Sequence, residues 1–130
     1  MKDSLNIVIA GATGYVGLEL TKILSKHPKS NILYLCATKS IGKSIQIFDK
    51  SINSSRLPKI SKINKVDWTN VDILFTALPN GEAQKIAKKI PENIKIIDLS
   101  ADFRLDSEEI YNDNYKTIHS CSKLLQEFAY

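Results

Sequence analysis

The stretch Ile7-Val8-Ile9-Ala10-Gly11-Ala12-Thr13-Gly14-Tyr15-Val16-Gly17 decides the fold of this chain. A strand-type apolar run ends in three glycines spaced three residues apart, and a helical pattern follows at once. In a parallel α/β sheet, such a strand–turn–helix unit offers a helix N-terminus to the pyrophosphate of a dinucleotide. The spacing is Gly-x-x-Gly-x-x-Gly rather than the commoner Gly-x-Gly-x-x-Gly. A tight turn that binds no ligand is the alternative, and the strands downstream favour the nucleotide site.

The three glycines have different predicted roles. Gly11 permits the tight turn, Gly14 lacks a Cβ so that a phosphate can approach the backbone, and Gly17 lets the new helix pack closely on its strand. The turn therefore supplies these candidate cofactor-binding residues: Gly11, Thr13, Gly14, Tyr15, Val16 and Gly17.

The composition is that of one ordinary globular domain. The chain has 130 residues, of which 43% are hydrophobic and 25% charged, and its formal net charge is +4. The lysines are scattered, with no basic stripe of the kind that nucleic-acid-binding proteins carry. We therefore expect anionic small molecules as ligands and no nucleic-acid partner.

The two cysteines, Cys36 and Cys121, have no metal-type spacing, and no metal site is expected. Cys36 lies in an apolar run, which predicts a buried small side chain in a protein of a reducing compartment. No apolar run reaches the roughly 18 residues needed to span a membrane, and the N-terminus lacks a signal-peptide pattern. The sequence therefore predicts a cytoplasmic protein with no membrane partner.

The apolar pattern alternates between strand type and helix type along the chain. We expect strands at 5–10, 32–37, 71–78 and 94–99, and helices from Gly14 to about 26–27, over 82–90, and in short pieces at 107–115 and 122–128. Near-continuous apolar strands suit a parallel sheet that is covered on both faces. The expected fold class is α/β: a Rossmann-like, doubly wound, mostly parallel sheet with flanking helices.

Two regions carry less regular patterns. Residues 44–65 predict a loop with short strand-like pieces around 45–48 and 59–63, an excursion that often covers the adenine side of such a site or carries an accessory strand. His27 follows the first helix, before Pro28, and is expected at the surface rather than in catalysis. His119 and Cys121 lack a third orienting group, so a catalytic Cys–His pair is not favoured.

The segment after the second strand bears on cofactor choice. An acid at this place binds the ribose 2′-hydroxyl of NAD, whereas a cation and hydroxyls accommodate the 2′-phosphate of NADP. This chain has no acid between Glu19 and Asp49, and it has Thr38, Lys39 and Ser40 where the acid would be. The pattern favours NADP, and an exposed polar loop without a ligand is the alternative.

The next two strands also end in candidate site residues. Leu78, Pro79 and Gly81 follow the third strand and are expected beside the pyrophosphate and the nicotinamide ribose. The fourth strand ends in Asp98-Leu99-Ser100-Ala101-Asp102-Phe103-Arg104, where Ser100 is a candidate cofactor contact. Arg104 could bind a substrate phosphate or carboxylate, or could pair with Asp102 or Asp98 to fix the turn.

Four motifs in this order resemble the amino-terminal, cofactor-binding part of the N-acetyl-gamma-glutamyl-phosphate reductase family. They are the glycine turn, Thr38-Lys39-Ser40-Ile41-Gly42-Lys43, Leu78-Pro79-Asn80-Gly81-Glu82 and Asp98-Leu99-Ser100-Ala101-Asp102-Phe103-Arg104-Leu105. The resemblance covers essentially the whole chain, and its most specific mark is the run from Ser100 to Arg104. Two positions depart from the family: Asn80 stands where histidine is common, and Thr38-Lys39 stands for Ser-Arg. Lysine keeps the charge but loses the guanidinium fork.

The resemblance implies an NADPH-dependent reductase of arginine biosynthesis. In that family a cysteine thiolate attacks an acyl phosphate and expels phosphate, and NADPH then reduces the thioester to N-acetyl-glutamate 5-semialdehyde. The family's nucleophile, in an Asn-Pro-Gly-Cys context, lies beyond the position of Tyr130, and neither Cys36 nor Cys121 matches it. The resemblance therefore implies that residues 1–130 are an incomplete NAD(P)-binding domain with no catalytic residue. The full-length enzyme is expected to form a homo-oligomer, and the fragment alone is expected to be inactive.

Two other interpretations stay open. One is a fragment of an aspartate-semialdehyde dehydrogenase-like acyl-phosphate reductase, which shares the glycine turn. The other is a non-enzymatic module that binds NADP.

Overall fold

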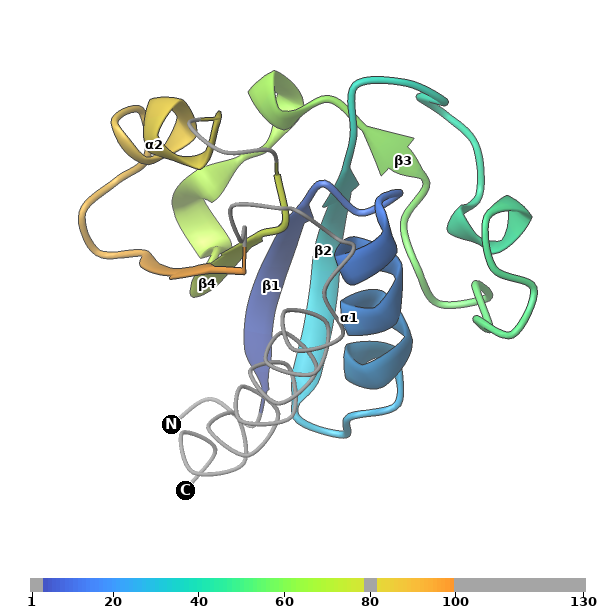
Figure 1. The fold of residues 1–130 in the computed structure, drawn as a ribbon. Coiled ribbons are helices and arrows are strands. Elements are labelled where there is room, and N and C mark those ends of the chain that lie inside the picture. Colours follow the sequence, from blue (N-terminus) through green and yellow to red (C-terminus); the bar gives the residue numbers. More distant parts are fainter. Residues whose placement is uncertain (1–3, 79–81, 100–130) are drawn as a thin grey trace, which may run out of the picture.

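The computed structural model describes residues 4–78 and 82–99. Within them, five strands form one sheet in the order β3-β2-β1-β4-β5, and every neighbouring pair runs parallel (Figure 1). The strands are β1 (Leu5–Ala10), β2 (Ser30–Cys36), β3 (Ile60–Ser61), β4 (Ile73–Thr76) and β5 (Lys95–Asp98). The two α-helices are α1 (Tyr15–Ser25) and α2 (Glu82–Ala87), and three 3-10 turns are η1 (Ile45–Ile47), η2 (Ile63–Lys65) and η3 (Trp68–Asn70).

The central strand β1 explains why the apolar run at 5–10 organises the chain. It lies between β2 and β4, and residues Ile7 to Ala10 are at most 1% exposed. A strand buried on both faces has no polar side to present, so its sequence is apolar throughout. Each large side chain buried in this way stabilises the fold by about 1.5–3 kcal/mol relative to exposure.

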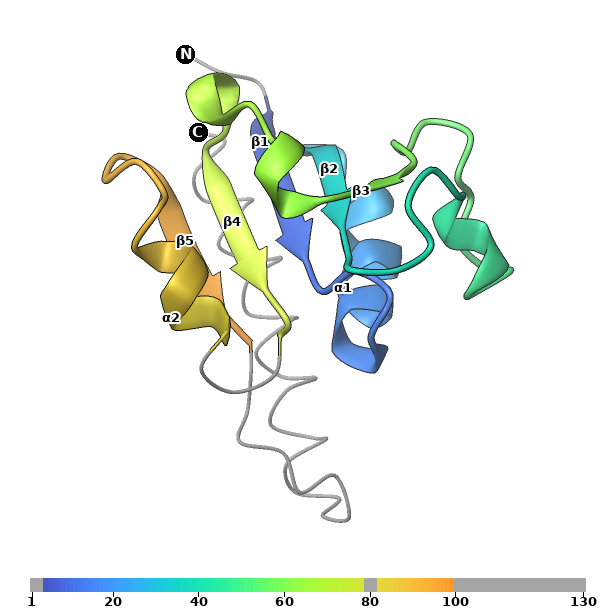
Figure 2. The same cartoon turned by 90° about the horizontal axis from the view of Figure 1, so that it is seen from above.

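The two faces of the sheet pack against different elements. Ile7 and Ile9 contact a core that includes Leu20 and Leu24 of α1. Val8 and Ala10 point the other way, into a second core with partners from the η3 and α2 regions. Figure 2 shows α1 and α2 on opposite sides of the sheet. Helices on both faces confirm the expected doubly wound α/β fold.

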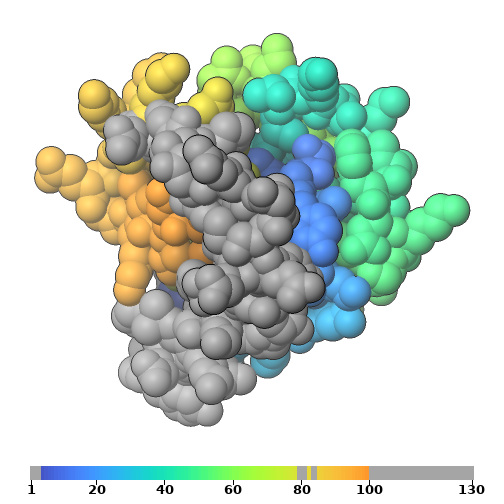
Figure 3. Space-filling model, viewed as in Figure 1, coloured from blue at the N-terminus to red at the C-terminus, as the bar shows by residue number. Residues whose placement is uncertain are grey.

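The excursion between β2 and β3 is built differently from its expected form. Residues 45–47 form the 3-10 turn η1 rather than a strand-like piece, because Ser44 caps it by accepting a hydrogen bond from the Gln46 N–H at 3.2 Å. The piece near 59–63 does contain a strand, the two-residue β3, which extends the sheet beyond β2. In the space-filling view (Figure 3), the excursion lies beside α1 and forms one flank of the molecule.

His27 corrects another expectation, because its side chain is buried rather than at the surface. It is 8% exposed, and its Nδ1 accepts a hydrogen bond from the Lys29 N–H at 3.0 Å. That bond holds the imidazole inside the turn between α1 and β2. The end of α1 itself agrees with the prediction, since Lys26 is the C-cap.

Three elements are shorter than their apolar patterns suggest. β4 ends at Thr76, α2 ends at Ala87, and β5 begins at Lys95. The helices expected at 107–115 and 122–128 lie outside the described residues. Among residues 4–78 and 82–99, no helix has both the length and the apolar character that crossing a bilayer requires.

Candidate functional site

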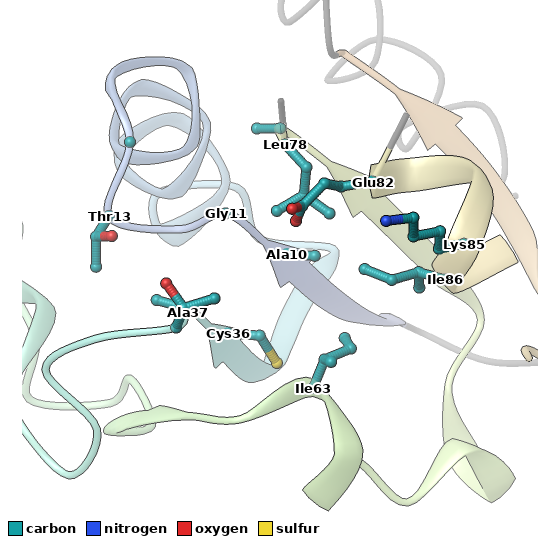
Figure 4. A pocket seen from close by; sticks show the side chains of 13 residues that line it. Ala10, Gly11, Thr13, Cys36, Ala37, Ile63, Leu78, Glu82, Lys85 and Ile86 are labelled. Atoms are coloured by element: carbon teal, nitrogen blue, oxygen red, sulfur yellow. The ribbon is translucent and has the colours of Figure 1, made fainter. Parts of the chain in front are cut away.

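A cavity of about 500 Å³ opens at the carboxyl ends of β1, β2 and β4 (Figure 4). This edge is where parallel α/β sheets bind ligands. Five of the sequence-derived candidates line it: Gly11, Thr13, Gly14, Thr38 and Leu78. The other described lining residues are Ala10, Cys36, Ala37, Ile63, Ala77, Glu82, Lys85 and Ile86.

The glycine turn is anchored to the neighbouring strands. The N–H groups of Gly11 and Ala12 both donate to the carbonyl oxygen of Cys36, at 2.9 and 3.0 Å. Gly11 has φ +82°, and a Cβ there would lie 2.3 Å from the carbonyl oxygen of Ala77. A left-handed backbone and a close approach to the end of β4 both require glycine at this position.

The other two glycines meet opposite surroundings. A Cβ at Gly17 would lie 2.0 Å from the Gly11 carbonyl oxygen, so this glycine permits close packing of helix on turn, as expected. A Cβ at Gly14 would meet only the Gly11 carbonyl oxygen, at an ordinary 3.5 Å. The fold therefore does not itself require glycine at 14. The missing side chain leaves room in the cavity, which suits the predicted approach of a phosphate.

The N-terminus of α1 has no anionic group of its own. Gly14 is the N-cap and has no side chain to cap the helix, and the first turn contains no acidic residue. The N–H of Leu18 donates to the Gly14 carbonyl oxygen at 2.8 Å. The N–H groups of a first helical turn lack intrahelical partners, and the helix dipole adds positive potential. This end of α1 can therefore bind an anion.

Of the three candidate residues after β2, one lies in the cavity lining. Thr38 lines the cavity, whereas Lys39, which is exposed, and Ser40, whose φ is 63°, do not. The N–H of Gly42 donates to the Ile60 carbonyl oxygen at 2.7 Å, which ties the loop to β3. Tyr15, Val16 and Gly17 of α1 also lie outside the cavity lining.

Cys36 lines the cavity without being reactive. It is 2% exposed, and its Sγ lies 3.9 Å from Ser61 Oγ. Burial raises the pKa of the thiol to about 11, against a weaker lowering by the Ser61 hydroxyl. A thiol with such a pKa stays protonated at neutral pH and is a poor nucleophile. This confirms the expected role of Cys36 as a buried small side chain.

Sequence reasoning missed the wall of the cavity that comes from the face of the sheet opposite α1. Ile63 reaches the cavity from η2, and Glu82, Lys85 and Ile86 reach it from α2. The last three are spaced i, i+3, i+4, so they share one helix face. That spacing was visible in the sequence. The position of Ile63 depends on how the irregular segment before β4 folds, which no pattern indicated.

A hydrogen bond between β4 and β5 was missed as well. Thr76 is fully buried, and its Oγ1 donates to Asp98 Oδ1 at 2.9 Å, while the Leu99 N–H donates to the Thr76 carbonyl oxygen at 2.7 Å. These bonds fix the end of β5 beside the end of β4. The candidates Pro79, Gly81, Ser100 and Arg104 lie outside the described residues, as do His119 and Cys121. In the described part of the chain, no group of three or more metal-ligating side chains could hold a metal ion.

Comparison with solved structures agrees with this architecture. The aspartate semialdehyde dehydrogenase with NADP from Candida albicans superposes with a TM-score of 0.60 at 24% identity, over 81% of this chain and 32% of that one. Aspartate semialdehyde dehydrogenase II of Vibrio cholerae superposes with a TM-score of 0.61 at 23% identity, over 79% of this chain and 30% of that one. At such identities, the likeness shows the fold alone.

Comparison of sequences is more specific. The N-acetyl-gamma-glutamyl-phosphate reductase of Ehrlichia ruminantium is 42% identical over 132 residues, which cover 100% of this chain and 38% of that protein. The enzyme of the same name from Cereibacter sphaeroides is 36% identical over 125 residues, or 96% of this chain and 36% of that protein. The chain thus spans little more than a third of the length of these relatives.

The family model described as "Semialdehyde dehydrogenase, NAD binding domain" matches residues 6–119. The match includes the glycine turn, the segment after β2 and the cavity wall from α2. The chain therefore belongs to the family of semialdehyde dehydrogenase NAD-binding domains.

Proposed function

We propose that this chain is the NADP-binding part of an N-acetyl-gamma-glutamyl-phosphate reductase. The whole enzyme would reduce an acyl phosphate to N-acetyl-glutamate 5-semialdehyde in arginine biosynthesis, with NADPH supplying the hydride. The observation that carries the proposal is the 42% identity to such a reductase over the whole chain. The cavity at the N-terminus of α1 supports it, because that position suits a dinucleotide.

The described residues suggest how the cofactor would be held. Gly11, Thr13 and Gly14 would surround the pyrophosphate, together with the first-turn N–H groups of α1 that Tyr15 and Val16 contribute. Gly17 would act indirectly, by letting α1 approach the turn. Leu78, at the end of β4, would contact the nicotinamide side.

The choice of NADP over NAD rests on Thr38, Lys39 and Ser40. Thr38 lines the cavity, and the side chain of the next residue, Lys39, is exposed. No acidic residue in this segment would repel a 2′-phosphate. A lysine attracts that group as a point charge, without the bidentate geometry of arginine.

Fluorescence titration of the purified chain with NADPH and NADH tests the cofactor assignment. We expect NADPH to bind about fivefold more tightly, since an ion contact between exposed groups contributes up to about 1 kcal/mol. Lys39→Ala should weaken NADPH binding and leave NADH binding unchanged, whereas Lys50→Ala, an exposed lysine away from the cavity, should change neither. Equal affinities for the two cofactors that Lys39→Ala does not alter would refute the preference.

The catalytic part of the proposal concerns residues outside this chain. The resemblance places the nucleophile beyond Tyr130, and Cys36 has the wrong protonation state to replace it. The 130-residue chain should therefore show no phosphate-dependent reduction of NADP with the semialdehyde. Such a reductase would act in the cytoplasm on a small acyl-phosphate substrate, and as a homo-oligomer when full length.

A second candidate is a module that binds NADP without catalysis, because the family model that matches residues 6–119 describes an NAD-binding domain. That candidate requires NADPH binding by the isolated chain and no gain of activity in any longer form. An aspartate-semialdehyde dehydrogenase-like fragment is less well supported, because the enzymes of that name from Candida albicans and Vibrio cholerae are 24% and 23% identical to this chain.

A further inference from the structure

The wall that α2 contributes holds the two charged side chains of the described cavity lining, Glu82 and Lys85. They are three residues apart and therefore share one face of the helix. In Figure 4 both side chains extend from α2 over the cavity, above the end of β1. A carboxylate here is unexpected in a site for an anionic ligand, because it would repel any phosphate close to it.

The surroundings of these two residues indicate which part of the ligand they face. Ile63 and Ile86 line the cavity beside them. In Figure 4 these two apolar side chains lie across the cavity from Thr13 of the glycine turn, where a pyrophosphate would bind. With the pyrophosphate at α1 and the ribose that carries the 2′-phosphate near Thr38, the flat group attached to that ribose, adenine, is the one that this apolar end can take.

The edge of adenine matches the pair of side chains in hydrogen-bonding type. Adenine presents a 6-amino donor next to the acceptor N7. An ionised glutamate only accepts hydrogen bonds, and a lysine only donates them. We propose that Glu82 accepts from the 6-amino group of the cofactor's adenine while Lys85 donates to a ring nitrogen, so that α2 selects the base. The inference rests on the proposed cofactor function.

A base with oxygen at position 6 distinguishes this arrangement from nonspecific stacking. Hypoxanthine presents O6 and N7, both acceptors, on the edge where adenine presents a donor and an acceptor. The Glu82 carboxylate would then face a second acceptor, while the apolar contacts with Ile63 and Ile86 stay the same. Because Glu82 and Lys85 are exposed, we expect a moderate penalty of about tenfold in affinity.

The experiment compares NADPH with reduced nicotinamide hypoxanthine dinucleotide phosphate by fluorescence titration of the whole chain. The unsubstituted protein should prefer NADPH by about tenfold. Glu82→Gln should reduce the preference to about twofold or less, because the amide can rotate to donate to O6. The matched control is Glu92→Gln, the same change at an exposed carboxylate outside the cavity lining, which should keep the preference.

A ratio of affinities does not change when a variant is partly unfolded, so loss of stability cannot imitate the expected result. Lys85→Met should weaken both cofactors several-fold, since both bases offer N7. If Lys85→Met instead weakened NADPH but not NADH, Lys85 would be a 2′-phosphate ligand and its proposed contact with the base would be wrong.

The outcomes also separate this inference from the proposed function. A protein that binds neither dinucleotide refutes both. A protein that binds the two equally well keeps its cofactor site and refutes selection by α2, and so does a preference that survives in Glu82→Gln.

Discussion

Gly17 and Gly11 are in direct backbone contact: a Cβ built on Gly17 would lie 2.0 Å from the Gly11 carbonyl oxygen and 2.8 Å from its carbonyl carbon. The helix α1 and the turn before it therefore meet without an intervening side chain. A Cβ built on Gly14 would make only an ordinary contact, at 3.5 Å from the Gly11 carbonyl oxygen. These two glycines separate the requirements of folding from those of binding.

Gly17→Ala should destabilise the chain by about 3 kcal/mol, because the new methyl group forces backbone against backbone. Alanine in an unconstrained helix would instead stabilise it by about 1 kcal/mol. Urea unfolding followed by circular dichroism measures the difference. A gain in stability would show that α1 can move away from the turn at little cost.

Gly14→Ala should leave the chain folded, at a cost of about 1 kcal/mol or less from the poorer N-cap. NADPH affinity should nevertheless fall by at least about tenfold, because the methyl group occupies the space in front of the α1 N-terminus. Calorimetric titration beside thermal melting tests both halves. Unchanged affinity in a folded variant would place the pyrophosphate elsewhere.

Cys36 should give the stability a dependence on alkaline pH. Its folded pKa, about 11, is above the reference value of 9.0, so the native state keeps a proton that the unfolded state loses. The stabilisation is complete below pH 9 and is lost as pH rises toward 11. Unfolding free energies of the chain and of Cys36→Ala should therefore converge over this interval by about 1–3 kcal/mol. A constant difference would contradict the raised pKa.

The same thiol should resist alkylation. At pH 7.5, iodoacetamide should modify Cys36 far more slowly than a free cysteine, because both burial and protonation oppose the reaction. Peptide mapping distinguishes Cys36 from Cys121. Saturating NADPH should slow the reaction further, since Cys36 lines the cavity.

Thr76→Val should cost about 1 kcal/mol by removing the hydroxyl that donates to Asp98. The loss should be local, because the backbone bonds between β4 and β5 remain. Hydrogen exchange at the Leu99 amide, which donates to the Thr76 carbonyl oxygen at 2.7 Å, reports on it. Faster exchange confined to the end of β5 is the expected result, and Thr69→Val, an exposed position, should leave it unchanged.

Much of the fold followed from the sequence because its strands are buried on both faces. A run such as 5–10 has no polar alternation, and the glycine turn that follows indicates a crossover helix. At two other places the prediction was wrong, because a local hydrogen bond to a side chain determines the structure there. Ser44 caps a 3-10 turn where a strand-like piece was expected, and His27 is held inward by the Lys29 N–H.

The candidate site could be predicted only where it lies close in sequence to the glycine turn or a strand end. Thr38 and Leu78 were found by that rule, and the cavity includes them. Ile63 could not be found, because its place depends on the path of the chain between β3 and β4. Lys39 was predicted from its charge. In the structure it is exposed and is not part of the cavity lining.

The double hydrogen bond from the Gly11 and Ala12 N–H groups to the Cys36 carbonyl oxygen has a consequence for how such a protein can change. It uses only backbone atoms, and the N–H of Ala37, the residue after β2, donates to the Ser61 carbonyl oxygen at 3.1 Å. Side chains at 38–40 can therefore be exchanged without disturbing the turn. Evolution, or an engineer, can alter the preference for one nicotinamide cofactor over another at these positions while the scaffold beneath stays in place.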